Sequence, residues 1–123
     1  MSSALLYYVY GLVMVASLAC FGQAWRTRLV TPVHKRWGGA GVGLALAGIV
    51  VVLVLTYVMG WRVDQRFPTV VRVHRLLALA ATALMLLVGL TGWRRMPIHK
   101  RLYVVFMPLY AVTVATALVG YTP

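Results

Sequence analysis

Acidic residues are almost absent from this chain. Of its 123 residues one is acidic, Asp64, against 12 lysines and arginines. A single carboxylate cannot supply the acid and base pair of a hydrolase, and no hydroxyl or thiol stands in a nucleophile motif with a base. Asp64 has Arg62 and Arg66 close by, where a surface ion pair is the ordinary explanation. The sequence therefore predicts a protein that is not an enzyme.

Cysteine is equally scarce. Cys20 is the only one, so no disulfide forms within the chain. It falls inside an apolar run, where it is expected to be a small buried residue. That run continues to spanning length and has no basic segment before it, and the Ser17-Leu18-Ala19 that precedes the cysteine resembles a lipoprotein cleavage box only loosely. We therefore expect a retained first span rather than a cleaved signal.

Apolar residues dominate what is present. They make up 63% of the chain and concentrate in four runs of about 18–25 residues, close to the roughly 20 that cross a hydrocarbon core. The expected fold is an all-α integral membrane protein, a four-transmembrane-helix up-down bundle. It forms a single transmembrane domain, 1–123, with spans at about 4–25, 37–61, 73–93 and 101–121.

The net charge of +11 has an explanation in the membrane. Eight basic residues lie in the first and third connections, and four lie around the second. The positive-inside rule then places the loops 26–36 and 94–101 in the cytoplasm and both termini outside. We expect a bacterial or archaeal inner membrane, with membrane lipids and a larger respiratory or photosynthetic membrane complex as partners. Nucleic-acid binding is excluded, because no basic patch interleaved with aromatic residues lies outside the apolar runs.

One short phrase occurs twice, as TPVHKR at 31–36 and MPIHKR at 96–101. Each copy precedes an apolar run, and a Trp-Arg pair closes the run before it. We interpret the chain as two parallel two-helix repeats related by an axis along the membrane normal. In an up-down bundle, the helices that follow the two phrases are parallel and lie on a diagonal. His34 and His99 are therefore expected at one depth, facing each other.

This diagonal predicts a cofactor. It measures roughly 11–14 Å, which admits a porphyrin held between two imidazoles. We predict haem, b-type first with haem A or O as alternatives, and His34 and His99 as its iron ligands. Two histidines without a nearby Cys, Asp or Glu would leave a tetrahedral zinc site half empty. The haem propionates would accept charge-assisted hydrogen bonds from the basic residues of the two phrases, Lys35, Arg36, Lys100 and Arg101.

Helical spacing predicts two different walls for this pocket. Four and seven residues after His34 are Gly38 and Gly41, whereas the same offsets from the second histidine give Tyr103 and Phe106. Glycine lets a flat ligand approach the backbone, so a macrocycle can lie over the glycines and against the aromatic rings. Tight helix packing is the alternative for the glycines, and a basic membrane anchor is the alternative for the histidines.

His74 stands apart from the pair. It is expected near the opposite membrane surface, so it cannot bind the same iron. A metal contact of its own, a second haem, a quinone and a simple interfacial hydrogen bond are the interpretations that remain open. The candidates to meet it are Tyr57 and Met59, at the end of the second run, and Tyr7, Tyr8 and Tyr10, at the start of the first.

The order and spacing of these histidines resemble a known family. The pattern includes the His-Lys before the second run, the Val-His that opens the third, the His-Lys that opens the fourth and the closing FMPLY at 106–110 and TALVGY at 116–121. Over about residues 31–121 it is similar to the small four-helix membrane proteins required for maturation of haem-A-containing cytochrome oxidase, the CtaM/YozB-like family. The resemblance implies a haem-associated protein that assists maturation or assembly of a terminal cytochrome oxidase. It singles out His34, His74 and His99, together with Tyr57.

Two other functions remain open. The histidine spacing by itself indicates a small bis-histidine b-type cytochrome that acts as an electron-transfer subunit of a respiratory or photosynthetic membrane complex. The other is a haem-free accessory subunit, whose glycines and aromatic residues only pack against larger partners.

Overall fold

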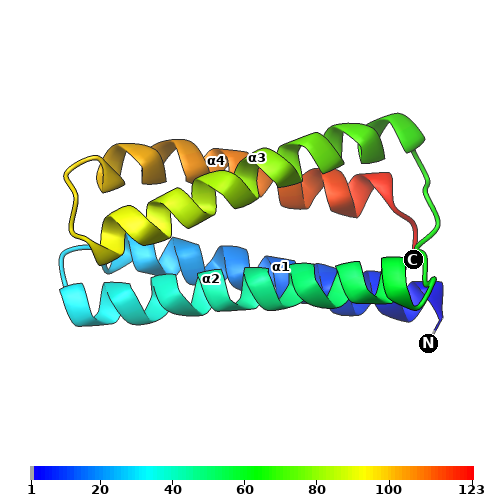
Figure 1. The fold of residues 1–123 in the computed structure, drawn as a ribbon, viewed down its shortest axis with the longest axis horizontal. Helices are drawn as coiled ribbons and strands as arrows, with labels where there is room; N and C mark the ends of the chain where they lie inside the picture. The colour runs from blue at the N-terminus through cyan, green and yellow to red at the C-terminus, as the bar shows by residue number, and fades with distance from the viewer. Residues whose placement is uncertain (1) are drawn as a thin grey trace.

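Four long helices, each antiparallel to the next along the chain, make up the computed structural model, which describes residues 2–123 (Figure 1). The helices are α1 (Ser3–Arg26), α2 (Thr31–Leu53), α3 (Pro68–Trp93) and α4 (His99–Gly120). A π-helical turn, η1 (Val54–Val58), continues α2 without a break. All four helices are long and apolar enough to cross a membrane. The predicted all-α, four-helix fold is confirmed.

Two of the helices begin earlier than the predicted spans. α2 begins at Thr31 and α3 at Pro68, instead of near residues 37 and 73. Each has a proline in its first turn. Proline is favoured there because its missing N–H has no helical partner to lose. The helices therefore include polar residues that precede the apolar runs.

The helices pair into two hairpins. α1 packs along α2, and α3 packs along α4, whereas α1–α4 and α2–α3 contact each other less extensively. Within residues 2–123, α2 and α4 make no close backbone approach, so they lie on a diagonal as predicted. In the view of Figure 1, α3 approaches α2 towards Trp93 and departs from it towards Pro68.

Small residues bring α1 and α2 together. A Cβ added at Gly41 would lie 2.8 Å from Cε1 of Phe21, so the phenyl ring occupies the space that a side chain would take. The Ser17 hydroxyl donates a 2.7 Å hydrogen bond to the Gly41 carbonyl. Ala24 and Ala45, on the same two helix faces, are fully buried. The close approach of backbones is the usual way in which membrane helices pack.

Aromatic rings fill the centre of the bundle. Phe21 of α1 packs edge-on against Phe106 and Tyr110 of α4, with ring centroids 5.0 and 5.3 Å apart. Met85 of α3 is buried in the same core. Edge-to-face aromatic contacts are favourable beyond the area they bury.

Tyrosine hydroxyls form hydrogen bonds across the α1–α4 side of the bundle but not across the α2–α3 side. Between α1 and α4, three of them donate hydrogen bonds, from Tyr7 to the Leu118 carbonyl, from Tyr110 to the Ser17 hydroxyl and from Tyr103 to the Phe21 carbonyl. Between α2 and α3, no side-chain hydrogen bond is formed in the part of the chain that the structure describes. We call the α1–α4 contact the closed seam and the α2–α3 contact the open seam.

Backbone hydrogen bonds fix both ends of α3. Just beyond its C-terminal end Arg95 has a φ of 52°, and the N–H groups of Arg95 and Met96 donate to the carbonyls of Gly92 and Thr91. This left-handed cap usually holds glycine. At the start of α3, the N–H groups of residues 66 and 67 donate to the Gly120 carbonyl at the end of α4. The loop between the hairpins is thereby fixed to the end of the chain.

Candidate haem and metal site

His34 and His99 meet across the bundle. Their ring centroids are 6.0 Å apart, and the ring planes are inclined at 81°. His34 is the fourth residue of α2 and His99 is the first of α4, and both side chains are half-buried. The two imidazoles therefore lie next to each other, one from each hairpin, as the diagonal predicts.

Each imidazole is held through Nδ1 by the preceding helix of its own hairpin. Nδ1 of His34 lies 2.6 Å from the Ala24 carbonyl of α1. Nδ1 of His99 lies 2.8 Å from the Val88 carbonyl and 3.4 Å from the Thr91 hydroxyl of α3. A carbonyl only accepts, so Nδ1 carries the proton in both rings. In a neutral imidazole the lone pair is then on Nε2, which is the tautomer of a metal-bound histidine.

The two Nε2 atoms are available to a ligand. Neither makes a hydrogen bond in the described residues, where no buried side-chain nitrogen or oxygen lacks a partner. Both Nε2 atoms must therefore keep some accessible surface. The centroid separation of 6.0 Å places the two rings next to each other, one from each hairpin.

Gly92 is a functional candidate that the sequence did not reveal. A Cβ built on it would lie 2.7 Å from Cε1 and 2.9 Å from Nδ1 of His99. Glycine thus lets the imidazole lie against the backbone of α3, within reach of the Val88 carbonyl. No periodic pattern marks this contact, because it joins residues on two different helices.

The predicted glycine wall is a helix-packing surface. A Cβ on Gly38 would lie 3.9 Å from the Cβ of Ala24, and one on Gly41 would lie 2.8 Å from Phe21. Both glycines therefore face α1. Their contacts favour the helix-packing alternative over the cofactor wall, because α1 occupies the face that the two glycines present.

The aromatic wall is partly beside the histidines. The Tyr103 ring lies 6.2 Å from that of His99 and stacks on Trp25, with centroids 5.6 Å apart and planes within 6°. Phe106 packs against Phe21 further into the bundle. These rings fill the layer next to the histidine pair.

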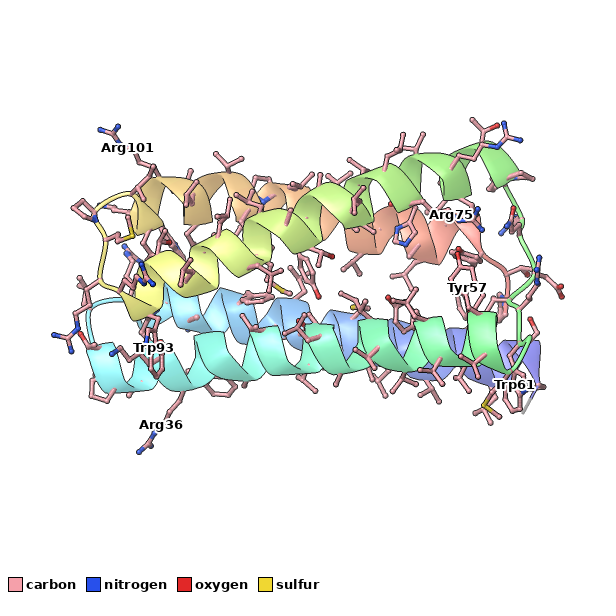
Figure 2. The ribbon with its side chains drawn as sticks, viewed as in Figure 1. Arg36, Tyr57, Trp61, Arg75, Trp93 and Arg101 are labelled. Carbon is pink, nitrogen blue, oxygen red and sulfur yellow. The ribbon has the colours of Figure 1, made fainter. Side chains whose placement is uncertain are left out.

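The basic residues of the two phrases point elsewhere. All four are exposed, and Figure 2 shows Arg36 and Arg101 extended away from the bundle. They surround the end that holds the histidines but make no hydrogen bond to them in residues 2–123. Contact with propionates would require these flexible side chains to turn inwards.

Two hollows of the described bundle are lined by neither His34 nor His99. One lies at the opposite end of the bundle, beside Trp61, and the other is an apolar surface hollow beside Trp25 and Tyr103. A macrocycle would fit between the histidines only after the two hairpins had moved apart.

His74 is held in the same manner at the other end of α3. Its Nδ1 lies 2.8 Å from the Thr113 carbonyl and 3.2 Å from the Thr116 hydroxyl of α4, and its ring is 6.1 Å from that of Tyr121. It is 17 residues before Thr91, which corresponds to about 25 Å along the helix. The structure therefore separates His74 from the His34–His99 pair. No cluster of three or more metal-ligating side chains occurs in the described residues.

The same hydrogen-bond motif occurs twice in the α3–α4 hairpin. In each case Nδ1 of a histidine lies within hydrogen-bond distance of a backbone carbonyl on the neighbouring helix and of the hydroxyl of a threonine three residues after that carbonyl. Each threonine hydroxyl donates to a carbonyl of its own helix, so it can accept from the imidazole. The acceptor pairs are Val88 with Thr91 for His99, and Thr113 with Thr116 for His74.

Comparison of the chain with protein-family models, with curated proteins and with solved structures finds no match. The resemblance to the CtaM/YozB-like family stays a prediction that rests on the order and spacing of the histidines.

Proposed function

We propose that this protein is a haem-associated integral membrane protein that holds haem transiently between its two hairpins and assists maturation or assembly of a terminal cytochrome oxidase. The observation that carries the haem assignment is the His34–His99 pair. It offers one imidazole from each hairpin, and each ring is held through Nδ1 in the tautomer that leaves Nε2 for a metal ion. The role in oxidase maturation comes from the family resemblance.

The packing around the pair favours transient over permanent binding. Tyr103 stacks on Trp25 and donates to the Phe21 carbonyl, so the layer beside the histidines is already filled. A haem held between the histidines would have to displace part of this layer, so its binding would compete with contacts that the closed bundle already makes.

The open seam supplies a route for a flat, apolar ligand. Separation of α2 from α3 breaks no side-chain hydrogen bond of the described residues, while Tyr7 and Tyr110 of the closed seam act as the hinge. His34 and His99 would each stay fixed to its own hairpin and would hold the iron through Nε2. Bound haem would supply a redox-active iron centre. The propionates would be held by the basic residues of the two phrases, Lys35, Arg36, Lys100 and Arg101.

We also propose an orientation. The histidine pair lies at the end of the bundle that carries eight of the twelve cations, which the positive-inside rule assigns to the cytoplasm. Both termini lie together at the other end (Figure 1), which is then the outer end of a bacterial or archaeal inner membrane. Lipids and a larger respiratory complex are the partners. The matching Nδ1 contacts within each hairpin support the two-repeat interpretation.

Haem titration into the purified protein tests the assignment. We expect a Soret band and a redox-sensitive alpha band, because two imidazoles make the iron six-coordinate. His34→Ala and His99→Ala should each weaken binding at least about tenfold, since each removes one ligand. His74→Ala is the matched control and should bind as the unmodified protein does.

The same preparation separates the remaining candidates. Stoichiometric haem that stays bound during purification and resists transfer to apomyoglobin would favour a small b-type cytochrome. No spectral change on addition of haem would reject haem association and leave the accessory-subunit role. In cells, loss of the protein should lower the haem content of the terminal oxidase, and His34→Ala should fail to restore it.

A further inference from the structure

We propose a second ligand site in the outer half of the open seam, where His74, Tyr57 and Arg75 hold the head group of a quinol. The site lies at the end of the bundle that carries the termini. It is independent of the His34–His99 pair and of the haem proposal.

His74 supplies a hydrogen-bond acceptor. Its Nδ1 faces the Thr113 carbonyl, which only accepts, so Nδ1 carries the proton and Nε2 of the neutral ring has the lone pair. Nε2 makes no hydrogen bond in residues 2–123, where no buried side-chain nitrogen or oxygen is left without a partner. It therefore has accessible surface. The α3–α4 hairpin orients this ring as firmly as it orients His99, yet no second histidine faces it.

Tyr57 approaches the same half of the open seam from the facing helix. It lies 23 residues beyond His34, or about 34 Å along α2, whereas His74 lies about 25 Å from the level of the histidine pair. Side chains on a helix lean towards its N-terminus. Because α2 and α3 are antiparallel, Tyr57 leans towards the level of His74, and His74 leans towards that of Tyr57. This lean reduces the difference of about 9 Å between the two levels, and a quinol head group with a ring oxygen at each end can bridge the remainder.

The local backbone presents Tyr57 rather than burying it. Its side chain is 79% exposed, and its hydroxyl makes no hydrogen bond in the described part of the chain. It stands on the π-helical turn η1, a rare geometry that is frequent at functional sites. In Figure 2, Tyr57 of η1 and Arg75 of α3 lie on the two facing hairpins, towards the end of the bundle that carries the termini.

These three groups match a quinol in both polarity and surroundings. Tyr57 and Arg75 are donors, whereas Nε2 of His74 is an acceptor. A quinol carries two ring oxygens at opposite ends, so one hydroxyl can donate to Nε2 while the other oxygen accepts from the phenol or guanidinium. Its apolar ring and tail suit a seam that opens to lipid. A metal is disfavoured, because no cluster of three ligating side chains occurs in the described residues.

The proposal makes the site selective for the reduced form. A quinone has no hydroxyl hydrogen to donate, so it cannot make the bond to Nε2. We expect decylubiquinol to bind the protein in lipid nanodiscs about tenfold more tightly than decylubiquinone, since one hydrogen bond distinguishes the two complexes. Quenching of tryptophan fluorescence reports both affinities, and Trp61 lies at this end of the bundle.

Matched variants test each group. His74→Phe should abolish the preference for quinol, because phenylalanine has no lone pair. Tyr57→Phe and Arg75→Gln should each weaken binding of both forms about threefold to tenfold. The controls are Tyr8→Phe, an exposed tyrosine near the same end, and Arg72→Gln, an exposed arginine on the same helix. Both controls should bind as the unmodified protein does.

Several results would overturn the site: no binding of decylubiquinol, equal affinity for the two redox forms, or equal effects of Tyr57→Phe and Tyr8→Phe. If His74→Phe fails to fold, the comparison of Tyr57→Phe with Tyr8→Phe tests the site, since the Tyr57 hydroxyl makes no contact on which the fold depends. Haem titration of the same preparations keeps the two proposals distinct. Quinol binding without haem binding would support this site alone.

Discussion

Gly92 shows how a single missing side chain positions a functional one. The His99 ring lies where a Cβ of residue 92 would be, and this places Nδ1 2.8 Å from the Val88 carbonyl. The two histidines of the pair were predictable, because a repeated phrase places them at equivalent points of two spans. Gly92 was not, because its role depends on how α3 and α4 are rotated against each other.

The substitution Gly92→Ala tests this role. Its Cβ would be 2.7 Å from Cε1 of His99, so the ring must turn away from Val88. We expect haem affinity to fall about tenfold or more, as happens when support of a metal-bound histidine is lost, together with a shifted reduction potential. The control is Gly89→Ala, less than one turn earlier on α3, where an added Cβ meets nothing within 4 Å. Equal spectra and affinities for the two variants would contradict the positioning role.

At the scale of elements, sequence patterns predicted the helices but not which neighbour each helix face contacts. Composition and hydropathy were sufficient to predict four spanning helices, and proline explains why α2 and α3 begin early. Gly38 and Gly41 were correctly placed on one face of α2, yet that face meets α1 rather than a cofactor. Spacing from a histidine defines a stripe, and the neighbour that covers it is chosen by packing. No sequence pattern predicts the π-helical turn η1.

Gly41→Ala measures the tightness of the α1–α2 contact. The new methyl group would overlap the Phe21 ring, which the aromatic core holds in place. We expect a loss of about 1–3 kcal/mol in the free energy of unfolding, typical of an overfilled core. Gly43→Ala, on the exposed side of the same helix, should be neutral or stabilising by up to about 1 kcal/mol. Unfolding in mixed micelles compares the two, and similar losses would show that Gly41 is not a packing constraint.

For the whole molecule, the difference between the two seams determines which helices are held together by side-chain hydrogen bonds. An up-down arrangement with α2 and α4 on a diagonal follows from the number of spans and the short connections. Which seam is hydrogen-bonded does not, because it depends on three tyrosines reaching oxygen acceptors on a helix distant in sequence. The resulting molecule is two hairpins joined along one edge.

Tyr103→Phe tests how the layer beside the histidines controls access. It removes the hydrogen bond to the Phe21 carbonyl while the ring remains, so stability should fall by about 1 kcal/mol. Haem uptake should become faster in stopped-flow measurements, because the layer that must move is less firmly held. Tyr7→Phe removes a bond from the same seam at the far end and should lower stability without a change in uptake rate. Identical uptake rates in the two variants would contradict this control of access.

Arg95 illustrates that two stages of the protein's life can favour different residues at one position. Glycine in this left-handed cap would relieve roughly 1 kcal/mol of backbone strain in the finished structure. It would also remove one of the cations that, on the orientation proposed above, keep this loop on the cytoplasmic side. The charge acts while the new chain enters the bilayer, and the strain is felt only after folding. At the end of α3, a residue suited to insertion stands where folding alone would favour another.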